Sequence, residues 1–182
     1  MEVINKPVDP ATDKNFESFC VLDDAWEARI SIQLLNTLKC AVPDMEETVS
    51  LNSIELFLVF LQSKLEMRIG EGVYAVALLR KFVAKESTKG KRVLNKKNIG
   101  TVLVCLAMLT MKACRDTICK NTYWARSFKI NSTVLNESEL RFLKMVDFDM
   151  FMDEEEFWRI YLELMEMPIE DQGQQSQINQ DT

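Results

Sequence analysis

One lysine stands out among the side chains that can do chemistry in this sequence. Lys112 directly follows the apolar run Val102–Met111, in which Thr110 is the only polar residue. Burying a charged amine at the end of such a helix is costly unless an anion and carbonyl oxygens lie nearby. The alternative is that the amine simply extends into water beyond the helix end. The sequence therefore predicts that Lys112 has either an anionic partner or a path to solvent.

The residues on which most enzymes depend are missing. The sequence contains no histidine, which excludes histidine-dependent catalytic triads and removes the commonest metal ligand. It also lacks a glycine-rich phosphate loop and any cluster of metal-ligating residues. We therefore expect no catalytic residue, no metal, no cofactor and no small-molecule substrate, and a small enzyme is the weakest alternative.

The cysteines are scattered, and none forms a C-x-x-C pair. They are Cys20, Cys40, Cys105, Cys114 and Cys119. An odd number of cysteines without a secretion signal is typical of reduced thiols, so we expect an intracellular protein, cytoplasmic or nuclear or both. Cys105 is expected in the core, whereas a reactive thiol is an alternative for Cys114 or Cys119.

Charge and hydropathy exclude two further classes of partner. The net charge of −6 argues against general binding of nucleic acid, which requires a basic face. The run Val102–Met111 is too short to insert into a membrane, because a spanning helix needs about 20 apolar residues. One basic segment, Lys85–Lys97 around Gly90, is either a solvated connector or a patch that faces a phosphate or a substrate.

The elements that must position Lys112 are helices. Only five glycines and four prolines occur in 182 residues, and apolar residues recur with helical spacing. Val102–Met111 is apolar on every side, which predicts a helix wrapped by other helices. Gly70 and Gly72 are expected to end one helix and to turn the chain into the next. We expect a flexible arm (1–20), an N-terminal helix (21–43), helices over 50–68, 73–84, 95–114, 122–128 and 135–146, a C-terminal helix (153–168) capped by Asp153, and a disordered tail (169–182).

The second half of the chain resembles the cyclin box. The signs are the apolar helix ending in Lys112, then Asp116 and Asn121, a short helix with Tyr123 and Trp124, the sequence LNESELRFL with Glu139, and FDMFM over Phe148–Met152. The pattern looks most like the single-box cyclins, namely cyclin Y and the fungal phosphate-regulatory cyclins. The resemblance implies an all-α fold: a five-helix cyclin box over residues 50–150, preceded by one N-terminal helix and followed by one C-terminal helix.

The resemblance implies a regulatory subunit rather than an enzyme. In cyclins the lysine and the glutamate pair with each other and with the backbone of the kinase's regulatory helix, so Lys112 and Glu139 take those roles here. The implied function is to bind a cyclin-dependent protein kinase as a heterodimer and to activate it by holding this helix in its active position. We expect apolar residues beside the pair to dock the kinase, with core positions as the alternative for each: Phe142, Leu143, Val104 and Met108.

Two other functions remain open at this stage. A cyclin-fold adaptor or scaffold would bind proteins without activating a kinase. A nucleic-acid-binding box of the general transcription factor kind would need a basic helix face, which the acidic composition disfavours. The first box helix carries Ile54–Leu61 where mitotic cyclins have an M-R-x-I-L-x-x-W motif, so their substrate-docking patch is not expected.

Overall fold

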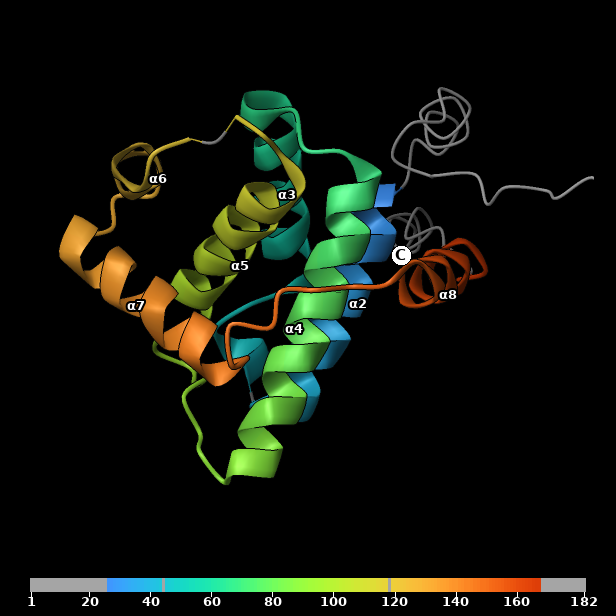
Figure 1. Ribbon diagram of the computed structural model, residues 1–182, viewed down its shortest axis with the longest axis horizontal. Coiled ribbons are helices and arrows are strands. Elements are labelled where there is room, and N and C mark those ends of the chain that lie inside the picture. The colour runs from blue at the N-terminus through green and yellow to red at the C-terminus, as the bar shows by residue number, and fades with distance from the viewer. Residues whose placement is uncertain (1–25, 44, 118, 168–182) are drawn as a thin grey trace, which may run out of the picture.

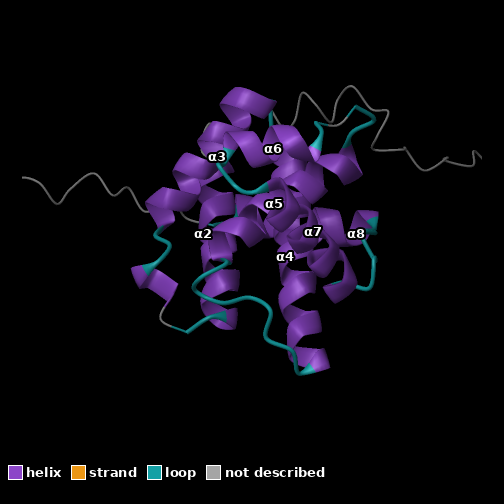
Figure 2. Cartoon of the chain, turned by 90° about the vertical axis from the view of Figure 1, so that its left-hand side faces the viewer, coloured by secondary structure: helices purple, strands orange, loops and turns teal. Residues whose placement is uncertain are grey.

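The chain folds into a bundle of helices, as Figures 1 and 2 show. The computed structural model describes residues 26–43, 45–117 and 119–167, and within them it contains no strand. The elements are α2 (Trp26–Ala41), the 3-10 turn η1 (Met45–Glu47), α3 (Leu51–Leu65), α4 (Ile69–Lys89), α5 (Ile99–Cys114), α6 (Asn121–Ser127), α7 (Ser132–Met145) and α8 (Glu154–Met165). The predicted all-α fold is confirmed, with five helices (α3 to α7) between one N-terminal and one C-terminal helix. The arm and the tail expected over 1–20 and 169–182 lie outside the described residues.

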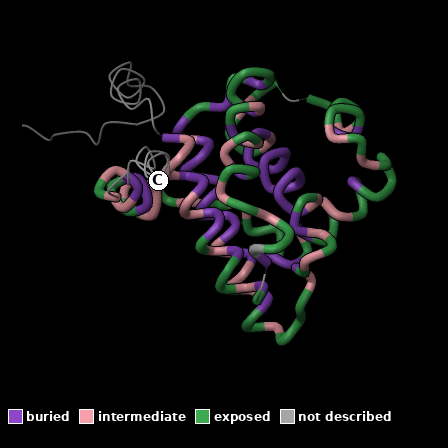
Figure 3. The backbone as a smooth tube through the Cα atoms, turned by 180° about the vertical axis from the view of Figure 1, so that it is seen from behind, coloured by how far each residue is buried: buried purple, intermediate pink, exposed green. Residues whose placement is uncertain are grey.

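Helix α5 is the buried centre of the bundle. Every residue from Val102 to Met111 is buried, including Thr110. Helices α4 and α7 pack along α5, and α6 contacts it as well (Figure 1). Figure 3 shows the buried residues gathered along the inner helices, with exposed residues on the outer turns. The prediction of an apolar helix surrounded by others is therefore confirmed.

Helix α4 begins earlier than the sequence pattern predicted. Gly70 and Gly72 lie inside its first turn, so the expectation that they end α3 and turn the chain is wrong. The turn is made instead by Glu66, which adopts the left-handed conformation (φ 52°) and closes α3. Gly72 serves close packing: a Cβ there would lie 3.0 Å from Ile30 Cγ1 and 3.2 Å from Trp26 Cζ3. A side chain at position 72 would therefore require Ile30 and Trp26 of α2 to shift by a few tenths of an ångström.

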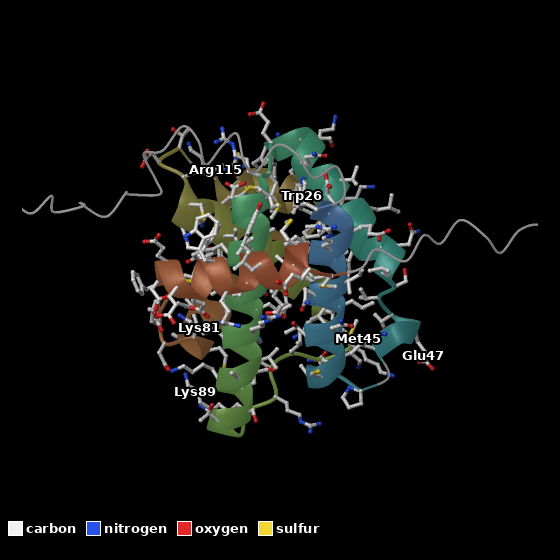
Figure 4. The ribbon with its side chains drawn as sticks, turned by 90° about the vertical axis from the view of Figure 1, so that its right-hand side faces the viewer. Trp26, Met45, Glu47, Lys81, Lys89 and Arg115 are labelled. Carbon is white, nitrogen blue, oxygen red and sulfur yellow. The ribbon has the colours of Figure 1, made fainter. Side chains whose placement is uncertain are left out.

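Helices α2 and α8 pack against the five-helix unit from outside. The buried stripe of α2 faces α3, α4 and α8 and consists of Trp26, Ile30, Leu34, Leu35 and Leu38. Helix α8 crosses α2 and α4 at a steep angle (Figure 4). Arg80 of α4 joins both flanking helices, because its guanidinium donates to Gln33 on α2 (2.7 Å) and to Glu163 on α8 (2.5 and 2.9 Å).

The helix ends follow local sequence. Ser50 and Ser53 form a capping box at the start of α3, and Asn131 accepts N–H bonds at the start of α7. Asp153 caps α8, since its carboxylate accepts the N–H of Glu156 at 2.7 Å, as predicted. The three glutamates that follow Asp153 lie at the positive end of the helix dipole.

Candidate partner-binding site

The structure brings Lys112 and Glu139 together. Lys112 lies in the last turn of α5 and Glu139 in the middle of α7, and the Lys112 Nζ is 2.6 Å from Glu139 Oε1. Helix α7 packs along α5, and this packing brings the two side chains within contact distance. Lys112 therefore has an anionic partner rather than only a path to solvent.

Asn121 completes this cluster. Its side-chain oxygen accepts from Lys112 Nζ at 2.6 Å, and its side-chain nitrogen donates to Glu139 Oε2 at 2.6 Å and to Asn136 at 2.8 Å. The three side chains form a closed ring that joins the end of α5, the start of α6 and the middle of α7. Sequence reasoning used Asn121 only as a sign of family resemblance. The one feature of the sequence that could have indicated this role is a side-chain amide at the start of the short helix that follows the apolar helix.

The ring of Lys112, Asn121 and Glu139 has hydrogen-bonding capacity left for a partner. The side chains of Lys112 and Glu139 are 24% and 15% exposed, so both reach the surface. An ammonium group has three N–H donors, and only two are used within the described residues. Each carboxylate oxygen of Glu139 has accepted one bond and can accept another. The ring can therefore donate to a carbonyl and accept from an N–H at one point.

Most of the apolar residues expected beside the pair lie in the core. Val104, Met108 and Phe142 are buried, so the expectation that they form an exposed docking surface is wrong. The ring of Phe142 packs on Phe82 of α4 with centroids 4.4 Å apart. The physical reason is that α7 packs on both α4 and α5, which leaves only its outer face open. Of the four residues, Leu143 alone remains partly exposed.

The exposed apolar surface instead follows the outer face of α7 into the connection to α8. Leu143 lies one turn after Glu139, and its carbonyl accepts the N–H of Phe148 at 2.8 Å. Phe148 and Phe151 are 59% and 75% exposed, and Leu140 is also exposed. We call Leu140, Leu143, Phe148 and Phe151 the α7 surface. Sequence analysis assigned no contact role to the two phenylalanines.

The backbone at the end of α7 is unusual. Asp147 and Phe148 both have φ near 58°, in the left-handed region. The N–H of Asp147 bonds to Lys144 O (3.4 Å), which with the Phe148 bond to Leu143 forms a Schellman ending. The same ending closes α4, but there Gly90 occupies the left-handed position. A phenylalanine in this conformation is rare because its Cβ crowds the backbone.

The basic segment begins on a helix, not in a loop. Helix α4 continues to Lys89, and Lys85 Nζ and Lys89 Nζ lie 2.8 and 2.5 Å from the carboxylate of Asp147. Hydrogen bonds from the two lysines lower the pKa of Asp147 to about 2. Lys85 and Lys89 thus pair with Asp147 on the surface, and residues 90–98 form the connection from α4 to α5.

A second ion pair supports the helix end that carries Lys112. Arg115 donates through Nε and Nη2 to the buried carboxylate of Glu71, and also to the carbonyls of Leu65 (2.8 Å) and Glu66 (3.0 Å). Glu71 in turn accepts the N–H of Arg68 at 2.9 Å. These bonds attach the end of α5 to the end of α3 and the start of α4. No pattern in the sequence predicts this pair.

Two of the cysteines near the site, Cys105 and Cys114, have thiols with raised pKa values. Cys105 is buried as predicted, and burial together with the nearby Glu139 raises the pKa of its thiol to about 12. Cys114 is an exposed residue, but desolvation of its thiol and the Glu71 carboxylate raise its pKa to about 11. Because the thiolate is the reactive form, this raised pKa disfavours the reactive-thiol alternative for Cys114.

Two further properties concern the described part of the chain. None of its helices combines the length and the apolar character needed to cross a bilayer. Over the same residues, no three acidic or cysteine side chains gather in an arrangement that would hold a metal ion.

Comparison with known proteins settles the family. The family model described as Cyclin matches residues 48–150, which is more than half of the chain and includes α3 to α7. The chain belongs to the cyclin family. The matched region of this cyclin contains the whole ring of Lys112, Asn121 and Glu139, whereas α2 and α8 flank it. No curated protein and no solved structure matched the chain.

Proposed function

We propose that this cyclin is the regulatory subunit of a cyclin-dependent protein kinase, and that Lys112, Asn121 and Glu139 bind the backbone of the kinase's regulatory helix. The observation that carries the proposal is the closed ring of these residues at the surface, with one ammonium donor and carboxylate lone pairs still available. The end of any helix leaves backbone groups unpaired. A spare lysine N–H and a glutamate oxygen side by side are suited to such groups.

The α7 surface supplies the apolar part of the proposed interface. Leu143 lies between the ion ring and Phe148, so polar and apolar contacts follow one another along α7. Protein interfaces are typically enriched in aromatic residues at their centre, as Phe148 and Phe151 would provide. Val104, Met108 and Phe142 then support this surface from the core and do not touch the partner directly.

The proposed mechanism is a shift in the kinase population. A kinase is active only when a glutamate on its regulatory helix reaches a lysine on a neighbouring strand. A rigid surface that binds the helix in this inward position favours the active state. Moving the kinase from 1% to 99% active requires about 5.5 kcal/mol of preference for that state. This role would place the protein in the cytoplasm or the nucleus, which agrees with its scattered cysteines.

We further propose that the cyclin is of the single-box type, as in cyclin Y and the fungal phosphate-regulatory cyclins. This proposal rests on the resemblance, and α8 packs back onto α2 and α4. Its buried stripe, formed by Ile160, Tyr161 and Leu164, faces α2 and α4.

The test is a binding and activation assay with purified cyclin-dependent kinases. We expect the wild type to bind one of them and to raise its activity, and Lys112→Ala and Glu139→Ala each to weaken binding at least tenfold. Arg141→Ala, which removes an exposed pair with Glu137 on the same helix, is the matched control and should bind normally. Normal activation by both site variants would contradict the proposal. Binding without any activation would favour an adaptor or scaffold instead.

A further inference from the structure

The connection between α7 and α8 is attached to α4 at several points. It runs across α4 (Figure 1), and the hydroxyl of Tyr74 donates to the carbonyl of Met150. Lys81 Nζ donates to the carboxylate of Asp149 (3.1 Å) and to the carbonyl of Phe151 (2.7 Å). The middle of the connection is thus held by one hydroxyl and one ammonium group.

Two more lysines hold the beginning of the connection. Lys85 and Lys89 both bind the carboxylate of Asp147, and Lys89 Nζ also donates to the carbonyls of Lys144 (3.1 Å) and Met145 (2.8 Å). The contacts therefore begin at the last turn of α7 and reach Phe151, with bonds before and after Phe148.

All four of these residues lie on one side of α4. Lys81, Lys85 and Lys89 are spaced by four, which places them one turn apart, and Tyr74 lies two turns before Lys81. Figure 4 shows Lys81 and Lys89 on the side of α4 next to this connection. We call Tyr74, Lys81, Lys85 and Lys89 the α4 row. Because α4 is also packed against α2 and α5, the row is a rigid support.

Two side chains of the segment that the row holds are largely exposed, whereas Met150 packs against the core. Phe148 has the disfavoured left-handed conformation, yet its ring is 59% exposed, and Phe151 is 75% exposed. An outlier that the surrounding structure imposes is a feature of functional sites. Here the α4 row binds the residues on both sides of Phe148, namely Asp147 and Asp149.

We propose that Tyr74, Lys81, Lys85 and Lys89 are positioning residues that hold segment 147–151 so that Phe148 and Phe151 are presented, already ordered, to an apolar helix face of the kinase partner. The identity of the partner rests on the function proposed above. A surface that is ordered before binding loses less conformational freedom in the complex, which strengthens binding without any added contact. The row acts on the partner only through the two phenylalanines.

The first test measures the order of the segment without any partner. Two variants remove the ion pairs of Lys85 and Lys89 with Asp147. They are Asp147→Asn and the double variant Lys85→Met/Lys89→Met. Asparagine keeps the size and tolerates the left-handed conformation, so it removes only the charge. We expect the amide hydrogens of Phe148 and Asp149 to exchange at least tenfold faster in both variants, a larger change than the small decrease in the urea midpoint that loss of this exposed pairing causes. Lys96→Met, which removes a distant surface pair with Glu47, is the control. Unchanged exchange in both variants would overturn the proposal.

The second test measures kinase affinity with the kinase that binds the wild type. The two variants should bind about tenfold more weakly, and Phe151→Ser should do the same while its amide exchange stays normal. Variants that exchange faster but bind as tightly as the wild type would show that order does not matter to the partner and would overturn the presenting role. If the wild type binds no kinase, the proposed function fails by itself, and the exchange experiment still decides whether the row holds the segment.

Discussion

Two clusters of lysine and carboxylate use the same chemistry in different surroundings. The Lys112–Glu139 pair is mostly enclosed, with side chains 24% and 15% exposed, and Asn121 binds both members. The Lys85–Asp147 pair is open to water, with side chains 38% and 51% exposed. Enclosed charges depend on each other because water cannot replace a lost partner, whereas water and salt screen exposed charges. The first cluster therefore stabilises the packing of three helices, and the second sets the conformation of one segment.

Glu139→Ala should have the largest effect on stability. It leaves the ammonium of Lys112 partly enclosed with Asn121 as its only described partner, so we expect the free energy of unfolding to fall by about 2–3 kcal/mol. Urea denaturation measures this change. Glu137→Ala removes the exposed pair with Arg141 from the same helix and should change stability by less than about 0.5 kcal/mol. Equal losses in the two variants would show that enclosure of the first cluster does not matter.

Asn121→Ala should have an intermediate effect. It removes one bond to each member of the pair but leaves the direct contact between Lys112 and Glu139 intact. We expect a loss of about 1–2 kcal/mol in the free energy of unfolding, again from urea denaturation. A loss as large as that of Glu139→Ala would mean that the amide, and not the ion pair, dominates the cluster.

The double variant Lys112→Met/Glu139→Leu should separate stability from binding. Replacing both charges of an enclosed pair by apolar groups of similar size avoids leaving either one alone. We expect the unfolding free energy to lie within about 1 kcal/mol of the wild type, clearly above that of Glu139→Ala. Kinase binding should nevertheless be lost. Retained binding in this stable variant would contradict a direct role of the charges.

The exposed cluster should show its effect mainly in titration. Because the pKa of Asp147 is lowered to about 2 in the folded protein and is about 4 when unperturbed, its pairing stabilises the fold above pH 4. This contribution is lost as the pH falls from 4 to 2. NMR titration of the Asp147 carboxyl should give this low pKa, and Lys85→Met/Lys89→Met should raise it toward 4. A pKa near 4 in the wild type would show that the contacts do not persist in solution.

The parts of the fold that follow one-dimensional patterns were predictable from the sequence. The apolar run Val102–Met111 predicted a wrapped central helix, and the cap at Asp153 followed from local chemistry. The pairing of Lys112 with Glu139 was implied by the family resemblance rather than by spacing.

The parts that depend on which helices approach each other were not predictable. The local sequence predicts a helix break at Gly72, because nothing local shows that Trp26 and Ile30 pack against it. Phe142 was expected at the surface beside Glu139, but α4 lies on that side of α7 and covers it. The exposure of Phe148 depends on a left-handed backbone held by lysines far away in the sequence.

The contacts of Arg80 bear on where this protein can be divided. Its guanidinium is shared by α2 and α8, and both helices lie outside the region that the family model matches. A fragment of residues 48–150 would lack both partners of the Arg80 guanidinium. It would also expose to water the apolar surface of α4 that α2 and α8 cover. The smallest independently stable piece is therefore longer than the region by which the family is recognised.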